Sequence, residues 1–157
     1  YTEAAIFASR HSYFATSQRV QAFISSCERL GIETDEKYIL KGSSTRNGGY
    51  EIGKQYAALK EPPKMIFCDS DAIALGALRA FHEEGISVPG DAELLSIGML
   101  DPEAASYYVP SLSVVEMPNK EIGQQVLRLM RKKVLNNDMS SEHVKVHAKL
   151  MLRESFS

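Results

Sequence analysis

The sequence lacks the features that mark membrane proteins, disulfide-rich proteins and nucleic-acid-binding segments. No run of apolar residues approaches the length needed to cross a bilayer, and the first residues carry neither the basic nor the long apolar region of a signal peptide. Only Cys27 and Cys68 occur, each among apolar neighbours, which predicts two buried free thiols and fits a reducing cytoplasm. The 18 Lys and Arg residues against 20 Asp and Glu residues argue against this stretch binding a phosphate backbone by itself.

Motifs for catalysis and for cofactors are also missing. The glycines form neither a G-x-G-x-x-G nor a P-loop pattern, so we expect no nucleotide cofactor. No G-x-S-x-G elbow or Cys/His pairing is readable, and we expect no enzyme. His143 and His147 are four residues apart, but they lie in a strand-like stretch, where that spacing separates them by two pleats. We therefore expect no metal site.

The sequence does have an alternation of short apolar runs with amphipathic stretches. This pattern predicts an α/β fold with a doubly wound, mostly parallel sheet. A chain of 157 residues with 44% apolar residues can bury a core without disulfides or a structural metal. Strands are expected near residues 4–8, 38–41, 65–68, 94–97, 112–116 and 144–152.

Four helices are expected between these strands. The first is capped by Thr16 or Ser17 and stops at Gly31, and the others cover residues 47–59, 72–84 and 119–135. The helix over 72–84 is apolar on more than one face, so we expect it to pack on the sheet and also on a second surface, most simply a subunit partner. Residues 99–110 are expected to be irregular.

Two carboxylates, Asp69 and Asp71, follow the third predicted strand. Ligands bind at the carboxyl ends of strands in open parallel sheets, so the pair could hold Mg²⁺ or accept a phosphoryl group. The simpler interpretation, which we favour, has Asp71 or Ser70 capping the next helix and Asp69 in solvent.

Polar residues also follow the other strands. Arg19 lies early in the first helix, Ser43 and Ser44 follow the second strand, and Asp101 follows the fourth. In a doubly wound sheet these positions converge with Asp69 on one edge. They predict either a cleft for a small polar ligand or simply hydrated loops.

A resemblance to a known family is carried by short segments in a fixed order. The segments are Arg19 to Phe23 (the family's R-x-x-G-F), Glu33 to Asp35, Gly49-Tyr50, Pro63 to Phe67, Asp71 to Gly76, Gly85 to Asp91, Pro110 to Ser113 and Arg153 to Ser155. Together they resemble the LacI/GalR transcription regulators over essentially the whole chain.

The resemblance implies a periplasmic-binding-protein-like core of two α/β subdomains, with an effector in the cleft between them. In the full protein an N-terminal helix-turn-helix would read operator DNA as a dimer. The present chain, which lacks an initiator Met and enters at once into a strand-like run, would be a fragment. Residues 1–114 and 144–157 would form the second subdomain, and residues 115–143 a return segment whose helix belongs to the incomplete first one. That helix would then be mobile or buried in a neighbouring molecule.

The resemblance also assigns site residues. Arg19 falls on the arginine that grips the effector, a role its planar fork suits. The other ligand-binding positions are Tyr13, Ser44, Ser70, Asp71, Leu100 and Asp101, and the dimer interface falls on Leu75 and Tyr108.

Three positions depart from the family pattern. Leu100 stands where the family has an effector-binding aspartate, and Asp101 follows one place later. Ser44 replaces an aromatic residue that is frequent in the family, and Met117 replaces the glutamine that precedes a proline. These changes indicate either an unusual effector or a core that responds to a partner protein.

The functional hypothesis is a cytoplasmic transcription regulator that senses a sugar or related metabolite, without cofactor or metal, and binds operator DNA as a homodimer through a domain absent from this chain. The first alternative is a periplasmic solute-binding protein for transport, which has the same fold. The second is a receiver-like phosphoacceptor that uses Asp69 or Asp71.

Overall fold

The protein is described by a computed structural model, which covers residues 1–11, 14–98, 102–136 and 140–156. Within these residues six strands form one sheet in the order β2-β1-β3-β4-β5-β6. They are β1 (Ala4–Ser9), β2 (Ile39–Gly42), β3 (Met65–Cys68), β4 (Glu93–Gly98), β5 (Ser113–Glu116) and β6 (Lys149–Met151). Strands β1 to β5 pair in parallel and β6 pairs antiparallel with β5, so the predicted α/β class with a mostly parallel sheet is confirmed.

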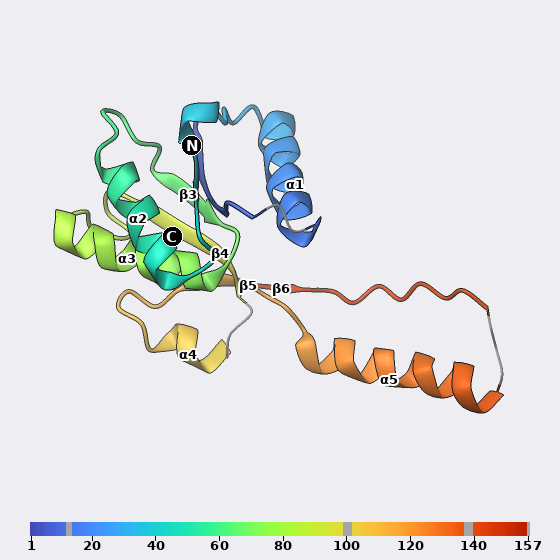
Figure 1. The fold of residues 1–157 in the computed structure, drawn as a ribbon. Helices are drawn as coiled ribbons and strands as arrows, with labels where there is room; N and C mark the ends of the chain where they lie inside the picture. The colour runs from blue at the N-terminus through green and yellow to red at the C-terminus, as the bar shows by residue number, and fades with distance from the viewer. Residues whose placement is uncertain (12–13, 99–101, 137–139, 157) are drawn as a thin grey trace.

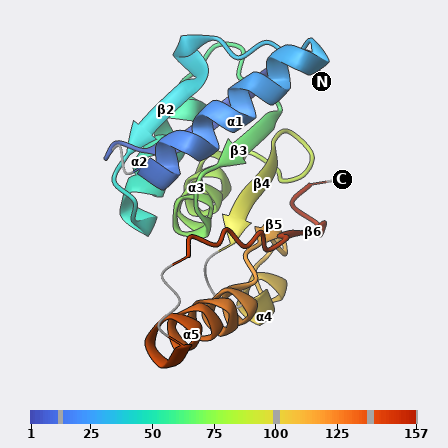
Figure 2. The ribbon, with the colours of Figure 1, turned by 90° about the vertical axis from the view of Figure 1, so that its right-hand side faces the viewer.

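Helices cover both faces of this sheet. The described helices are α1 (Phe14–Leu30), η1 (Glu36–Tyr38, a 3₁₀ turn), α2 (Arg46–Ala57), α3 (Asp71–Glu84), α4 (Pro102–Ser106) and α5 (Asn119–Asn136). Figure 2 shows α1 in front of the sheet and α2 and α3 behind it. Gly31 and Gly85, which follow α1 and α3, have φ values of 69° and 73°, a conformation that favours glycine and ends the helices where predicted.

Two apolar clusters fill the space between the sheet and its helices. Alternate side chains of β1 point to opposite faces, so Phe7 packs behind the sheet, where its ring centroid lies 5.5 Å from that of Tyr56 and 6.2 Å from that of Phe81. On the α1 side, Phe67 stacks on Phe23 with ring centroids 4.5 Å apart. This burial on both faces accounts for the apolar strands of the sequence.

Three local expectations were wrong. Helix α1 begins at Phe14, so Thr16 and Ser17 lie in its first turn rather than at its cap. Residues 99–110 contain α4, which starts at a proline, a residue whose fixed φ suits the first helical position. The strand expected over 144–152 shrinks to β6, because only Lys149 to Met151 find partners on β5. Residues 140–148 instead run beside α5, and both project away from the sheet (Figure 1).

Helices α2 and α3 touch through glycines. A Cβ on Gly76 would lie 1.9 Å from the carbonyl oxygen of Arg46, and a Cβ on Gly49 would lie 2.1 Å from that of Ile73. The glycines that weaken α2 as an isolated helix therefore allow the two backbones to approach closely. Part of the second apolar face of α3 is thus buried within this chain, against α2.

The end of the chain is fastened to the middle of the sheet. The buried Ser155 accepts a hydrogen bond from the Ser113 N–H at 2.8 Å, and its hydroxyl donates to the Leu94 carbonyl, also at 2.8 Å. Arg153 Nη1 donates to the Leu112 carbonyl at 2.8 Å. The Arg153-Glu154-Ser155 segment thus holds the chain at the starts of β4 and β5.

We expect Gly76→Ala to lower the free energy of unfolding by about 2 kcal/mol or more, because overpacking against the α2 backbone outweighs the gain of about 1 kcal/mol in helix propensity. The matched control is Gly123→Ala in α5, where a Cβ would meet nothing within 4 Å. Urea denaturation should show no loss of stability for this control. Equal effects of the two substitutions would contradict the proposed role of the α2–α3 contact.

Candidate functional site

The carboxyl edge of the sheet contains a change of winding direction between β1 and β3. The chain leaves β1 to form α1 on one face, whereas it leaves β2 and β3 to form α2 and α3 on the other. In doubly wound sheets the loops that follow two such strands diverge, and ligands usually bind in the crevice between them. The polar residues at this edge are consequently the first place to look for a binding site.

Asp69 lies buried at the centre of this edge. It is 2% exposed, and its Oδ2 accepts a hydrogen bond from the N–H of Ser9, the last residue of β1, at 2.8 Å. The expectation that Asp69 is in solvent was therefore wrong, because its carboxylate serves as the acceptor for a backbone N–H at the end of the neighbouring strand. Its Oδ1 has no hydrogen-bond partner among the described residues.

The environment of Asp69 shifts its titration. Burial raises the pKa of this carboxyl above its ordinary value of 3.8, while the Ser9 N–H, the Arg19 guanidinium and Ser70 act in the opposite direction. The folded protein consequently binds a proton at this site more tightly than the unfolded chain does.

Arg19 reaches the same point from α1. Its Nη1 donates a hydrogen bond to the carbonyl oxygen of Asp69 at 3.1 Å, and the side chain is half-buried. The arginine selected from the sequence and the buried aspartate are thus brought together at the crevice, from positions 50 residues apart.

The remaining predicted site residues differ in their setting. Ser70 caps α3, where its Oγ accepts from the Ile73 N–H at 3.5 Å, and Asp71 is buried in the first turn of that helix. Ser44 is exposed in the loop between β2 and α2. Tyr13, Leu100 and Asp101 lie outside the described residues.

The predicted dimer contacts Leu75 and Tyr108 are both half-buried, and Tyr108 packs against the larger core cluster. Their contact with a second subunit stays a prediction.

The phosphoacceptor alternative does not fit this geometry. A nucleophilic carboxylate must meet its phosphoryl donor, yet Asp69 and Asp71 are only 2% and 7% exposed. In the part of the chain that the structure describes, no group of three His, Cys, Asp or Glu side chains could hold a metal ion. Cys27 and Cys68 are free and buried, as predicted.

Sequence reasoning missed a small cavity beside α1. Its volume is about 150 Å³, and the charged residues in its lining are Arg10 and Lys41. The sequence does contain a signal for it. Lys41 lies two residues after Ile39 and therefore on the same face of the sheet, where a charged side chain is unexpected if that face is buried.

Comparisons with known proteins agree with this architecture. The family model described as a periplasmic binding protein-like domain matches residues 1–156. The chain is 30% identical over 138 residues to the HTH-type transcriptional repressor PurR of Mannheimia succiniciproducens, which covers 88% of this chain and 41% of that repressor. It is 32% identical over 133 residues to the HTH-type transcriptional repressor CytR of Escherichia coli strain K12, which covers 85% of this chain and 37% of that repressor.

A solved structure extends the likeness to three dimensions. The crystal structure of a LacI family transcription regulator from Clostridium acetobutylicum superposes with a TM-score of 0.91 at 30% sequence identity. The match covers 98% of this chain and 57% of that one. Separately, no helix within the described residues combines the length and apolarity that a membrane span requires.

The raised pKa of Asp69 predicts a specific pH dependence. Protonated Asp69 favours the folded state, so its contribution to stability is fully present below the ordinary pKa of 3.8 and is lost as the pH rises through the raised value. The stability of Asp69→Asn relative to the parent should therefore increase with pH over this window, as measured by urea denaturation.

Asp91→Asn is the control with the opposite sign. The hydrogen bonds of Ser87 lower the pKa of Asp91, so this variant should lose stability relative to the parent as the pH rises from the lowered pKa to about 3.8, above which the difference stays constant. A relative stability of Asp69→Asn that falls with pH would overturn the role given to burial.

Proposed function

Because this chain belongs to the periplasmic binding protein-like family, in the form carried by LacI-family transcription regulators, we propose that it is the effector-sensing part of a bacterial DNA-binding transcriptional repressor. The family match over residues 1–156 carries the proposal, and Arg19 at the β1–β3 crevice supports it. The chain spans only 41% of the PurR repressor and 37% of the CytR repressor. DNA binding by the whole protein is therefore proposed along with effector sensing.

The effector we propose is a sugar or a related small metabolite. The planar guanidinium of Arg19 can donate two parallel hydrogen bonds to paired hydroxyls or a carboxylate. Ser44 and Ser70 follow β2 and β3 at the same edge of the sheet, and they would supply hydroxyl groups. Asp71, predicted as a further contact, is only 7% exposed and would meet an effector only at the edge of its carboxylate. Tyr13, Leu100 and Asp101 complete the proposed set of contacts.

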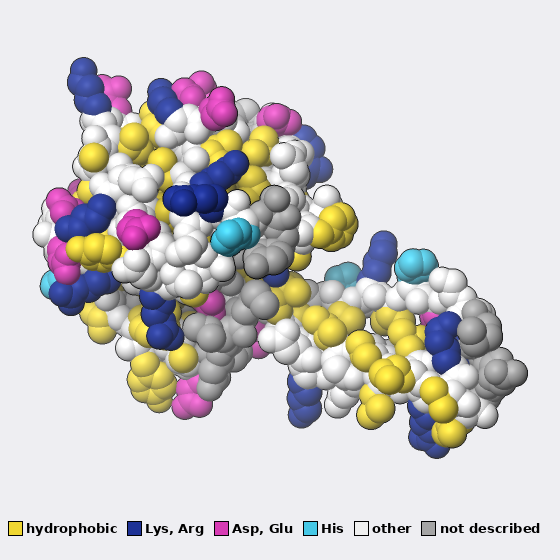
Figure 3. All heavy atoms as spheres, in the orientation of Figure 1, with side chains coloured by type: hydrophobic (Ala, Val, Ile, Leu, Met, Phe, Trp, Pro, Cys, Tyr) yellow, Lys and Arg dark blue, Asp and Glu magenta, His cyan; other side chains and the backbone are white. Residues whose placement is uncertain are grey.

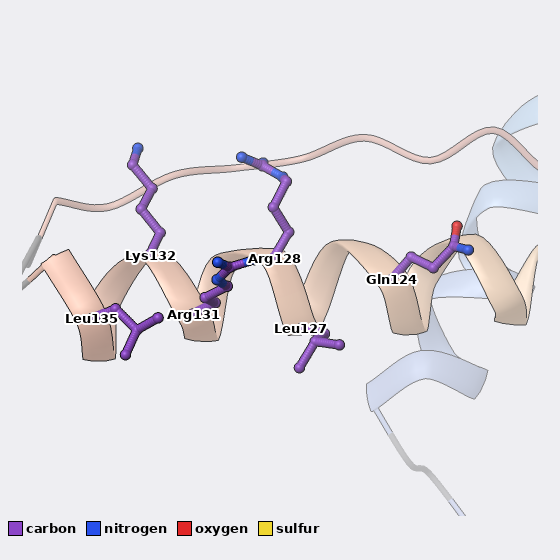
Figure 4. Close-up of a pocket in the computed structure, with 6 residues that line it drawn as sticks. All are labelled: Gln124, Leu127, Arg128, Arg131, Lys132 and Leu135. Carbon is purple, nitrogen blue, oxygen red and sulfur yellow. The ribbon is translucent and has the colours of Figure 1, made fainter.

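Helix α5 supports a two-subdomain organisation. Its large apolar side chains are 50% to 77% exposed, namely those of Val126, Leu127, Met130, Val134 and Leu135. Figure 3 shows hydrophobic side chains along the part of the molecule that contains this helix. In Figure 4, Arg128 and Lys132 point toward the extended segment that runs beside α5, whereas Leu127 and Leu135 point away from it.

Glu142 belongs to that segment, and its carboxylate lies 2.6 Å from Arg128 Nη2 and 3.1 Å from Lys132 Nζ. One side of α5 is therefore covered by residues 140–148, and its apolar side has no cover within the described chain.

We accordingly propose that residues 115–143 belong to a first subdomain that lies largely outside this chain, whereas residues 1–114 and 144–157 form the second. The homodimer would form through Leu75 and Tyr108, and operator DNA would bind a helix-turn-helix that precedes the core. We propose a cytoplasmic location and no catalytic activity. The names of the relatives, which are repressors, favour regulation over solute transport.

Arg19→Ala is expected to weaken effector binding by about tenfold to a hundredfold, because hydrogen bonds to a charged group contribute roughly 1.5–3 kcal/mol. Isothermal titration calorimetry of the intact protein with ribose, ribose 5-phosphate and adenosine would first identify a ligand. Arg29→Ala, an exposed position at the far end of α1, is the control and should bind normally. If the identified ligand binds Arg19→Ala as tightly as the parent, the crevice is not its site.

Hydrogen exchange tests the subdomain assignment. In the 157-residue chain alone, the amides of α5 should exchange quickly, because one side of the helix packs only on residues 140–148. In the longer protein they should exchange at least about tenfold more slowly, since the apolar face would be buried. The amides of α3 serve as the control and should be protected in both. Equal exchange of α5 in the two proteins would refute the assignment.

A further inference from the structure

We propose that the cavity between α1 and the ends of β1 and β2 binds a small oxyanion the size of a phosphate group. Its lining includes the side chains of Ala8, Arg10, Thr16, Ser17, Val20 and Lys41. Arg19 is not among its lining residues, so this site is separate from the effector contact proposed above.

The strand pattern explains why a cavity forms here. The register pairs Ile6 with Ile39 and Ala8 with Lys41, so these four side chains lie on the α1 face of the sheet. The face is apolar at Ile6 and Ile39, where α1 packs closely. One step further along, the small side chain of Ala8 leaves a hollow between the sheet and α1, and Lys41 stands at its edge.

The charges around this hollow have one sign. Arg10 continues β1 on the same alternation as Ala8, so a guanidinium and an ammonium stand at the same opening. Neither cation forms an ion pair within the described residues, and no acidic residue lines the cavity. Asp69 contacts Ser9 from the β3 side, but its carboxylate is buried and is not part of the lining.

Neutral donors complete the site. The hydroxyls of Thr16 and Ser17 come from the first turn of α1, where the helix dipole favours a negative charge. Two cations, two hydroxyls and an apolar floor formed by Ala8 and Val20 match the donor set that a phosphate or similar oxyanion requires.

The size of the cavity limits the ligand. Its volume of about 150 Å³ lies below the range of roughly 300–1,000 Å³ typical of pockets for whole drug-sized molecules. An anionic group fits this volume, and a nucleoside does not. The anion could be free phosphate, or it could be the phosphate group of a larger molecule whose remainder lies outside the cavity.

The test is calorimetric titration of the intact protein with inorganic phosphate at low ionic strength. We expect Arg10→Gln and Lys41→Gln each to weaken phosphate binding about tenfold, because each removes a charge-assisted hydrogen bond. The matched control is Lys60→Gln, an exposed lysine that precedes β3 at the opposite edge of the sheet, and it should bind phosphate as the parent does. The proposal fails if the parent does not bind phosphate, or if Lys60→Gln weakens binding as much as the cavity variants do.

Two further titrations separate the sources and the sites. Ribose 5-phosphate that binds more tightly than phosphate, with the excess lost in Arg19→Ala, would identify a phosphorylated effector bridging both sites. Equal binding of the two probes would identify a free anion. Phosphate binding should persist in Arg19→Ala. A parent protein that binds phosphate but none of the sugars would count against the proposed effector and leave the anion site standing. Loss of phosphate binding in Arg19→Ala would overturn the separateness of the two sites.

Discussion

Asp69 joins three segments at the point where the sheet changes its winding direction. Its side chain accepts a hydrogen bond from Ser9 at the end of β1, and its carbonyl oxygen accepts one from Arg19 on α1. A carboxylate with so little exposure is costly to bury, and the Ser9 N–H offsets part of this cost at Oδ2, so the loop after β3 is held by the strand and the helix beside it. This contact holds the Arg19 guanidinium at the edge of the sheet, where the proposed effector would meet it, rather than in bulk solvent.

The helices on the two faces of the sheet are packed with different tightness. Behind the sheet, glycines bring the backbones of α2 and α3 together, and the rings of Phe7, Tyr56 and Phe81 fill the space beneath them. Little adjustment is available there, because a Cβ added at Gly49 or Gly76 would meet the backbone of the other helix. In front of the sheet α1 packs on a smaller apolar cluster and leaves a hollow near Ala8. Both Arg19 and the cationic cavity belong to this less tightly filled side.

The sequence predicts the parts of the molecule that depend on local pattern. Strand β3 was predicted at its observed bounds because all four of its residues are apolar. The strand predicted over 144–152 was too long, because alternation along the chain carries no information on whether β5 offers partners. Arg19 was indicated both by its place early in the first helix and by a family resemblance, whereas the burial of Asp69 was missed. The N–H that it serves lies 60 residues earlier in the chain, and no local signal records that pairing.

The mechanism of sensing is constrained by thermodynamics as well as by structure. A ligand shifts a conformational equilibrium only by the difference between its affinities for the two states. An effector held by Arg19 and its neighbours alone would meet the same groups in every orientation of the two subdomains, and it would shift nothing. The effector of the proposed regulator must therefore also contact the subdomain to which α5 is assigned. Helix α5 begins three residues after β5, and β5 is fastened to the end of the chain through Ser113 and Ser155. The connection between the subdomains thus starts from a firmly held part of the sheet. Effector binding therefore has to act by changing the orientation of the subdomains rather than by local unfolding of β5.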